Sequence, residues 1–353
     1  MNLNKTILTV IFSFIAILAL LGGYSSWNAA NPQRTCASCH EISPSVSEWE
    51  QSAHREIKCT ECHGTAISNG IHSLKEKTGM ILTHFGKQTK HEDIRLTEQQ
   101  VLDISDKCAK CHQSEYVKWK SGGHSANYGD IFMNGKHNML EAPYWACLRC
   151  HGMFYDGTIK TLVEQPRDAN GIWKIKDAAQ TMHPTIPCLA CHQFHAVNSP
   201  MERTARLDSP QEIYYARPQR NPSIAWYVRS DNRHLRADKL MKITIVHDGK
   251  PVKVSDDPAQ RLCLQCHSPN FSHHSGSQDD RTPTGVHEGL SCMACHSPHS
   301  NDARNSCKNC HPAISNCKLD VTTMNTTYKD INSPNNIHSV TCTSCHEQRK
   351  RAS

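Results

Sequence analysis

One five-residue pattern, Cys-x-x-Cys-His, occurs nine times in 353 residues and constrains this chain more than any other feature. In chain order, the nine motifs are motif 1 with Cys36, Cys39 and His40; motif 2 with Cys59, Cys62 and His63; motif 3 with Cys108, Cys111 and His112; motif 4 with Cys147, Cys150 and His151; motif 5 with Cys188, Cys191 and His192; motif 6 with Cys263, Cys266 and His267; motif 7 with Cys292, Cys295 and His296; motif 8 with Cys307, Cys310 and His311; and motif 9 with Cys342, Cys345 and His346. This spacing is the attachment signature of c-type haem, in which two thiols bond to the vinyl groups and the histidine becomes the proximal iron ligand. Zinc knuckles and redox dithiols also contain Cys-x-x-Cys, but they do not require a histidine directly after it. We therefore expect nine covalent haems.

The composition is that of a chain whose core is filled by cofactors. Hydrophobic residues make up 37% and aromatic residues 6% of the sequence, and the mean hydropathy is −0.59, which is little apolar material for a conventional core. Each haem is a large apolar body around which short helices and loops can pack. We expect a mainly α fold with much irregular loop, organised around nine covalent haems, with one short β-hairpin insert. The chain without haem should be largely unfolded.

The cysteine count fits this interpretation. Eighteen of the 19 cysteines lie in the nine motifs, and Cys317 is left over. Its simplest role is a free or packed thiol; the alternatives are an intermolecular disulfide or a haem ligand. Because thioether attachment takes place outside the cytoplasmic membrane, we expect a periplasmic or extracellular location.

The formal charge of +6 does not indicate nucleic-acid binding. An oxidised bis-histidine haem with ionised propionates carries about −1 charge and a reduced one about −2, so nine haems would bring the protein to roughly −3 or −12. We therefore expect no nucleic-acid partner and interpret the Lys and Arg side chains as partners of the propionates.

The N-terminus carries Lys5 followed by an apolar run over residues 7–21. This run is either a cleaved signal peptide or an uncleaved anchor, and we favour the anchor because no clear cleavage site follows. Lys5 places the N-terminus in the cytoplasm and the haems on the periplasmic side. If the segment is retained, Cys36 lies thirteen residues past Gly23, which places the first haem at the membrane surface within reach of quinol. If it is cleaved, the protein is exported to the periplasm or beyond.

The spacing of the motifs predicts four regions. They are residues 1–31, a signal peptide or membrane anchor; 32–200, a five-haem domain; 201–261, a haem-free connector with a β-hairpin; and 262–353, a four-haem domain.

The five-haem region contains a repeated order of residues. Residues 36–64 and 108–152 both contain a motif, then Trp-x4-His, then a second motif followed by Gly, with the tryptophans at Trp49 and Trp119. This order indicates a duplicated di-haem module, with motifs 1 and 2 in one copy and motifs 3 and 4 in the other.

Two local patterns predict regular structure. Apolar residues recur at three- and four-residue spacing over residues 71–104, which predicts helix, and Thr97 with Gln100 is a capping box that starts the helix leading into motif 3. Residues 240–254 are predicted to form a hairpin because an Asp-Gly pair at 248–249 lies between β-branched runs.

Fifteen histidines lie outside the motifs, and nine bis-histidine haems would need nine of them as distal ligands. The candidates are His54, His124, His183, His287 and His338, followed by His72, His84, His195 and His299. Bis-histidine ligation closes the iron to substrate and favours outer-sphere electron transfer at low potential. A haem without a distal ligand would be a candidate catalytic centre.

The apolar N-terminus, motifs 1 and 2, and the residues between these motifs (Pro44, Trp49 and Ser52-Ala53-His54) form one continuous pattern. It resembles the NapC/NirT and NrfH family of membrane-anchored multihaem quinol dehydrogenases, and the resemblance covers roughly the first third of the chain. It implies a membrane anchor, a periplasmic haem domain and electron transfer from quinol. The wider pattern, which includes Trp119 and His124, is similar to the superfamily of pentahaem nitrite reductase, octahaem hydroxylamine oxidoreductase and octahaem tetrathionate reductase.

These features support two main functions. Nine redox centres are more than one active site needs, so we expect an electron-transfer cytochrome that takes electrons from the quinol pool or a membrane quinol dehydrogenase. It would pass them to a periplasmic or outer-membrane acceptor. The alternative is an oxidoreductase that acts on nitrite, hydroxylamine or tetrathionate at one open haem.

Two features of the sequence bear on the choice between these functions. The Arg- and Tyr-rich stretch at residues 203–234 is either a structural linker or a substrate or partner surface, and the second interpretation favours an enzyme. No motif ends in Lys, as the active-site motif of pentahaem nitrite reductase does, so we expect an electron carrier rather than a catalyst and assign no catalytic residue. A subunit of an extracellular haem filament is a third interpretation, and the N-terminal anchor is evidence against it.

Overall fold

The computed structural model describes residues 3–38, 42–64, 96–167, 171–195, 224–230, 232–247, 249–267, 283–300 and 338–340. The chain divides into two compact units. The N-terminal unit comprises Met1–Ile94 and Phe194–Met201, and the main unit comprises Arg95–Gln193 and Glu202–Ser353.

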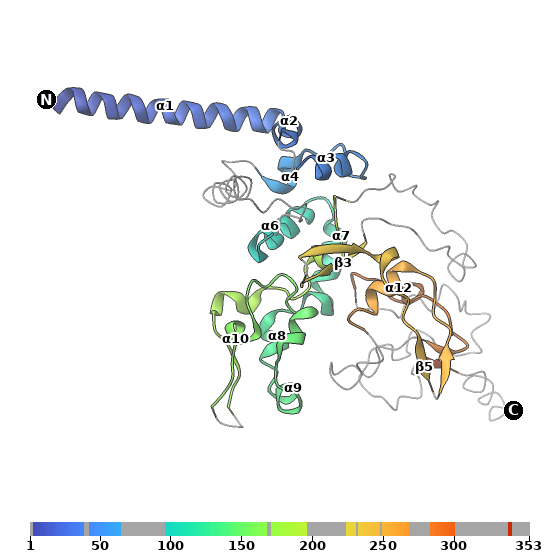
Figure 1. Ribbon diagram of the computed structural model, residues 1–353. Coiled ribbons are helices and arrows are strands. Elements are labelled where there is room, and N and C mark those ends of the chain that lie inside the picture. Colours follow the sequence, from blue (N-terminus) through green and yellow to red (C-terminus); the bar gives the residue numbers. More distant parts are fainter. Residues whose placement is uncertain are drawn as a thin grey trace. The chain divides into compact units, whose positions relative to one another are not determined.

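The N-terminal unit begins with α1 (Leu3–Ala30), which Figure 1 shows as one uninterrupted helix. Lys5–Trp27 has 23 residues with a mean hydropathy of 2.4. At about 1.5 Å per residue this stretch is roughly 35 Å long, enough to cross a hydrocarbon layer of about 30 Å. Its large apolar side chains are exposed in the protein. By length and composition α1 can therefore cross a membrane, and a signal sequence shares both properties.

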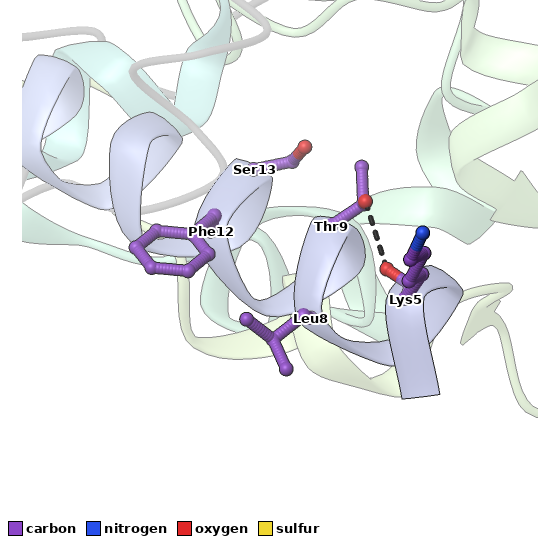
Figure 2. A pocket seen from close by; sticks show the side chains of 5 residues that line it. All are labelled: Lys5, Leu8, Thr9, Phe12 and Ser13. Atoms are coloured by element: carbon purple, nitrogen blue, oxygen red, sulfur yellow. Dashed lines mark hydrogen bonds between the residues drawn. The ribbon is translucent and has the colours of Figure 1, made fainter. Parts of the chain in front are cut away.

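The first turns of α1 already satisfy one polar side chain inside the helix (Figure 2). The Thr9 hydroxyl donates a hydrogen bond to the Lys5 carbonyl at 2.9 Å, while Leu8 and Phe12 carry apolar side chains on the same turns. A hydroxyl bonded to the carbonyl four residues earlier needs no outside partner. This is the arrangement that a lipid environment requires.

Three short helices follow α1 in the same unit. They are α2 (Pro32–Ala37), α3 (Ser43–Glu50) and α4 (Cys59–His63). A proline stands in the first turn of α2 and of α3, where its missing N–H leaves no helical hydrogen bond unmade. Helix α4 ends at Gly64, whose φ of 70° is a conformation that favours glycine. Helix α2 packs against both α3 and α4, which brings Cys36 to motif 2.

The main unit begins at the predicted capping box. The Thr97 amide donates to Gln100 Oε1 at 2.8 Å, the Gln100 amide donates to Thr97 Oγ1 at 3.4 Å, and α6 (Glu98–Cys108) runs from there into motif 3. This prediction is confirmed, while the earlier part of the predicted helix, residues 71–95, lies outside the described residues.

Short helices make up most of the rest of the main unit. They are α7 (Gln113–Lys120), η1 (Gly123–Ser125), α8 (Tyr128–Phe132), α9 (Gly135–Leu140), η2 (Trp145–Arg149), α10 (Ile159–Leu162), η3 (Ala178–Met182), η4 (Cys188–Ala190), η5 (Ala237–Lys239), α12 (Pro258–Cys263) and η7 (Cys292–Ala294). With the long loops between them, they agree with the predicted mainly α fold rich in irregular structure.

A small hydrophobic core lies around motif 4. Its buried members are Tyr128, Phe132, Leu148, Tyr155, Leu162, Val163, Trp173 and Ile175. Leu148 stands between the two cysteines of motif 4 and is 1% exposed, so this motif is fixed to the core by its own intervening residue.

The described strands form two-stranded pairs. Three are antiparallel: β1 (Val163–Glu164) with β2 (Lys174–Ile175), β3 (Ala225–Val228) with β4 (Arg233–Arg236), and β5 (Ile245–His247) with β6 (Lys250–Val252). The fourth, β7 (Thr284–Gly285) with β8 (Ser339–Val340), is parallel.

The predicted hairpin within residues 240–254 is confirmed as β5–β6. Its turn contains Gly249 with φ 74°. The prediction of a single hairpin was wrong, because β1–β2 and β3–β4 are also antiparallel pairs of consecutive strands. Ala225, Trp226 and Tyr227 in β3 are all buried, so the strand lacks the alternation of apolar and polar residues that would have revealed it.

Candidate haem-binding sites

Motifs 2 to 7 lie within the described residues, and motifs 3 to 7 share one local structure. In these five motifs the histidine amide donates to the carbonyl of the first cysteine at 2.8–3.0 Å, and the second cysteine's amide donates to the same carbonyl at 3.1–3.2 Å. Two hydrogen bonds to one carbonyl close a single tight turn over the five residues. In motif 2 the corresponding residues form the short helix α4.

The other motifs are described in part or not at all. Of the three haem-binding residues of motif 1, only Cys36 is described. The motif residues outside the described ranges, together with the leftover cysteine, are Cys39, His40, Cys307, Cys310, His311, Cys342, Cys345, His346 and Cys317. Their assignment to haem stays a prediction.

The second cysteines of the described motifs differ in exposure. Cys62 of motif 2 and Cys111 of motif 3 are exposed, whereas Cys295 of motif 7 is half-buried. An exposed thiol can bond to a haem edge without displacing core side chains. The attachment predicted for these three cysteines is therefore sterically open, and most so in motifs 2 and 3.

His112 completes motif 3 at the start of α7. Its carbonyl accepts from the Tyr116 amide at 2.9 Å, which places the ring at the first turn of that helix. Its charge contributes to the lowered pKa of His192, after burial and the charge of His299. The imidazole of motif 3 is therefore close enough to act on the imidazole of motif 5.

Four motif histidines face a histidine from elsewhere in the chain. The ring centres of the pairs are 6.1 Å apart for His63 and His195, 6.0 Å for His192 and His299, 6.0 Å for His267 and His124, and 6.0 Å for His296 and His338. In every pair one ring belongs to a motif and the other is one of the predicted distal ligands.

This spacing fits a metal held between two imidazoles. A metal bonded to two ring nitrogens at about 2 Å each, with each ring centre roughly 1.1 Å behind its nitrogen, separates the centres by about 6 Å. Aromatic rings in direct contact also have centres about 4.5–7 Å apart, so one such distance would decide little. The near-identical value in four pairs, each of one motif ring and one other ring, is what favours the metal. The donors therefore fit haem iron with two axial histidines.

Two of these opposing histidines are oriented by backbone carbonyls. His195 Nδ1 lies 3.0 Å from the Ser45 carbonyl, and His124 Nδ1 lies 3.1 Å from the Pro298 carbonyl. Because a carbonyl only accepts, Nδ1 must carry the proton, which makes Nε2 the unprotonated nitrogen that can bind a metal. Metal-bound histidines commonly have such a partner, which fixes the ring and makes the ligand more basic.

Burial keeps motif imidazoles in the form that binds metal. It lowers the pKa of His151 and of His192 to about 4, since the buried site disfavours the imidazolium. At neutral pH both rings are uncharged and can donate a lone pair to iron.

Thiols of different motifs lie against one another. In four places one thiol lies close enough to another to shift its pKa: Cys36 and Cys59, Cys108 and Cys188, Cys150 and Cys266, and Cys263 and Cys292. The contact with Cys36 lowers the pKa of Cys59 to about 7, and the contact with Cys108 lowers that of Cys188 to about 7. These shifts bear only on the chain before attachment, because a thioether does not titrate.

These contacts define which motifs are neighbours. Motif 1 lies beside motif 2, motif 3 beside motif 5, and motif 6 beside motifs 4 and 7. Packing of α6 on η4 and of α12 on η7 agrees with the second and last of these relationships. Arg149 in motif 4 donates to Gln265 in motif 6 at 3.1 Å. The spatial order of the motifs therefore differs from their order along the chain.

The two tryptophans of the repeated pattern make equivalent hydrogen bonds. Trp49 Nε1 donates to the Ile57 carbonyl at 3.1 Å, and Trp119 Nε1 donates to the Ile186 carbonyl at 3.1 Å. Each accepting residue stands two positions before the first cysteine of a motif, Cys59 in one case and Cys188 in the other. The indole of Trp119 therefore connects with motif 5, whereas the order along the chain had assigned motif 4 to this copy.

The remaining predicted ligands lie in varied surroundings. His54 packs edge-on against Phe194 with ring centres 5.3 Å apart, and His183 Nδ1 lies 3.4 Å from Glu98 Oε2. His287 is half-buried at the turn that precedes motif 7. The two predicted distal ligands outside the described residues are His72 and His84.

Sequence reasoning missed two residues near these sites. Glu98 is buried and accepts a hydrogen bond from the Tyr128 hydroxyl as well as facing His183, and burial together with this carboxylate raises the pKa of Tyr128. His137 in α9 contributes to the lowered pKa of His151 through its charge. Spacing from a motif gave no signal for either one.

One histidine is unsuited to bind iron through Nε2. His234 Nε2 lies 2.7 Å from the Leu189 carbonyl, so this nitrogen carries the proton. His234 is therefore a structural residue that ties β4 to η4.

Two family models match parts of the chain. The NapC/NirT cytochrome c family, N-terminal region, matches residues 1–156, from α1 to motif 4. The model of cytochrome c554 and c-prime matches residues 227–297, which include motifs 6 and 7. Neither a curated protein nor a solved structure matches the chain significantly. Both families consist of c-type cytochromes, so two separate parts of the chain carry the same chemistry.

Proposed function

We propose that this chain, a multihaem c-type cytochrome that resembles the NapC/NirT family, carries electrons through nine covalent haems. The electrons would come from the membrane quinol pool and go to a periplasmic or outer-membrane acceptor. The observation that carries the proposal is the set of four imidazole pairs with ring centres 6.0–6.1 Å apart.

The side chains of each pair would hold one haem iron between them. When bound, haem supplies a one-electron redox centre. Two imidazoles leave no position for a substrate, so they restrict the site to outer-sphere transfer. The residues that would hold each iron are His63 with His195, His192 with His299, His267 with His124, and His296 with His338.

Contacts between motifs support a continuous conduit in the main unit. Motif 3 touches motif 5 through Cys108 and Cys188, and motif 6 touches motifs 4 and 7. Cys191 of motif 5 also interacts electrostatically with Cys263 of motif 6. Five motifs thus form one connected set, which is the arrangement that a conduit needs and a single active site does not.

The N-terminal unit supports the proposal that electrons enter the protein at the membrane. Helix α1 contacts α2, and α2 carries Cys36 of motif 1. If α1 stays in the membrane, motif 1 lies at the membrane surface, on the periplasmic side given Lys5. This position suits electron uptake from quinol.

The test is anaerobic reduction of the detergent-solubilised holoprotein by a short-chain quinol, followed at the haem absorption bands. We expect rapid reduction of most of the haem and low-spin ferric EPR signals that added nitrite, hydroxylamine and tetrathionate do not change. Failure of quinol to reduce the protein would overturn the proposed donor. A high-spin ferric signal that shifts with one of the three substrates would overturn the pure conduit.

A second function, reduction or oxidation of a small nitrogen or sulfur species, is favoured by one observation at motif 4. Among the described residues no imidazole faces His151 at the pair distance, and its Nδ1 is buried without a hydrogen bond. The same EPR measurement decides this candidate, because an iron without a distal histidine gives the high-spin signal.

A further inference from the structure

Residues 296–299, His296-Ser297-Pro298-His299, contact three different imidazole pairs. The ring of His296 faces His338, and the ring of His299 faces His192, each at 6.0 Å between ring centres. The Pro298 carbonyl lies 3.1 Å from Nδ1 of His124, whose ring faces His267 at 6.0 Å. Four consecutive residues therefore reach the histidine ligands of motifs 5, 6 and 7.

The backbone of this segment is held in a turn. The Ser300 amide donates to the Ser297 carbonyl at 3.2 Å, which closes the turn around Pro298 and His299. Proline fixes its own φ near −65°, so the direction of the Pro298 carbonyl and the position of the following His299 are coupled. A change at residue 298 therefore bears on more than one of the three sites.

Contacts away from the segment bring two of these motifs, 6 and 7, together. Asp257 caps α12 by accepting from the Ala259 amide at 2.9 Å, and its second carboxylate oxygen accepts from the Ser291 hydroxyl. Since α12 ends at Cys263 and Ser291 precedes Cys292, this carboxylate ties motif 6 to motif 7. The thiols of Cys263 and Cys292 are themselves in contact.

We propose that residues 296–299 are a shared support that holds three haems at once: the motif 7 haem by His296, the motif 5 haem by His299, and the motif 6 haem through the carbonyl that orients His124. This inference rests on the proposed function in requiring bis-histidine haems. Its consequence is that motif 6, with motifs 4, 5 and 7 as neighbours, is a branch point of the conduit. The Pro298 carbonyl also makes His124 a more basic ligand and so favours ferric iron at that site.

The test uses methionine as a label for single sites in the holoprotein. His299→Met and His338→Met each convert one bis-histidine site to His–Met ligation, which has its own near-infrared absorption band. The midpoint potential of the labelled haem is then measured by spectroelectrochemistry with and without Pro298→Gly. We expect Pro298→Gly to change the labelled redox equilibrium by at least about threefold in both backgrounds. In the unlabelled protein it should also alter the EPR signal that His124→Met abolishes.

Pro269 provides a matched control, because it follows motif 6 in the same His-Ser-Pro order but is followed by Asn270 instead of a histidine. Pro269→Gly should leave both labelled potentials unchanged. An effect of Pro298→Gly on only one label, or an equal effect of Pro269→Gly, overturns the shared support. Haem counting by mass spectrometry shows whether each variant has bound all its haems. If Pro298→Gly fails this check, Pro298→Ala takes its place. Reduction by quinol is measured in a separate experiment. The redox test of residues 296–299 can therefore be interpreted even if quinol does not reduce the protein.

Discussion

The indole of Trp119 donates its hydrogen bond to the carbonyl of Ile186, 67 residues further along the chain, at 3.1 Å. The same bond in the N-terminal unit spans eight residues, from Trp49 to Ile57. In both units, a tryptophan in the helix that follows one motif is therefore hydrogen-bonded to the residue two positions before the first cysteine of another motif. In the main unit, motif 4 and the core around it lie within the intervening stretch of chain.

Replacing Trp119 with Phe should destabilise the main unit. Trp119 is 7% exposed, and the substitution leaves the Ile186 carbonyl without its donor, which costs about 1–3 kcal/mol. The measurement is thermal unfolding of the holoprotein. Trp145→Phe is the matched control, because Trp145 is 77% exposed and its loss should change stability by no more than about 0.5 kcal/mol. Equal effects of the two substitutions would contradict the assigned bond.

Local features of this fold could be predicted from the sequence, whereas distant partnerships could not. The capping box of Thr97 and Gln100 and the turn at Gly249 depend on residues within a few positions, so their chemistry is visible in a short window. The four histidines that face a motif imidazole are also among the predicted distal candidates, because histidine is the expected sixth ligand. The pairing of His63 with His195 was not, since it depends on how the chain returns to the same site.

Burial explains why β3 and the contacts of Glu98 could not be predicted from the sequence. The strand β3 is buried on both faces and shows no alternating pattern, and Glu98 is a buried carboxylate whose two partners come from other elements. Nothing in the spacing of Glu98 distinguishes it from a solvent-exposed residue of a helix N-terminus. The association of motif 5 with Trp119 likewise required the fold.

Removing His195 should open one iron. The His195→Ala variant leaves His63 as the single axial ligand, so we expect one new high-spin ferric EPR signal, equivalent to one haem, with haem content unchanged. His234→Ala should produce no such signal, because His234 Nε2 is bonded to the Leu189 carbonyl. The assignment of His195 fails if the high-spin signal is absent from its variant.

The imidazole pairs should differ in their EPR spectra. The ring planes of His296 and His338 are 7° apart, whereas those of His124 and His267 are 56° apart. Nearly parallel axial imidazoles split the iron d orbitals strongly and give a rhombic low-spin signal, and more crossed planes give a signal with a larger maximal g value. We expect His124→Met to remove a large-g signal and His338→Met to remove a rhombic one. The reverse pattern would contradict the geometry.

The buried Tyr128 should make the protein sensitive to alkaline pH. Burial, followed by the Glu98 charge, raises the pKa of Tyr128 above its ordinary value of 10. Above about pH 10 the unfolded chain releases this proton and the folded chain keeps it, so the free energy of unfolding falls as pH rises. Tyr128→Phe should flatten this fall between about pH 9 and 12 in thermal unfolding of the holoprotein. Tyr144→Phe, at an exposed position, should change the slope much less.

All nine motifs should carry haem, including motifs 8 and 9. Because each motif supplies both thiols and the proximal histidine, the intact mass of the purified protein should exceed that of the polypeptide by nine haems. Cys317→Ser should keep that count, since Cys317 belongs to no motif, while Cys310→Ser should disturb only the haem of motif 8. A count other than nine in the wild-type protein would contradict the assignment of every Cys-x-x-Cys-His as an attachment site.

Helix α1 should hold the mature protein in the membrane. Its 23-residue span has the length and hydropathy of a membrane-crossing helix, and Thr9 satisfies its hydroxyl within the helix, so retention costs no unpaired polar group there. We expect intact mass to include residues 1–31 and the protein to stay with membranes after a high-salt wash. Exchange of residues 1–31 for a cleavable signal peptide should give a soluble protein with the same haem count that membrane quinol no longer reduces, while dithionite still does. If the soluble form accepts electrons from membrane quinol as fast as the wild type, α1 serves export and the donor must be a separate quinol dehydrogenase.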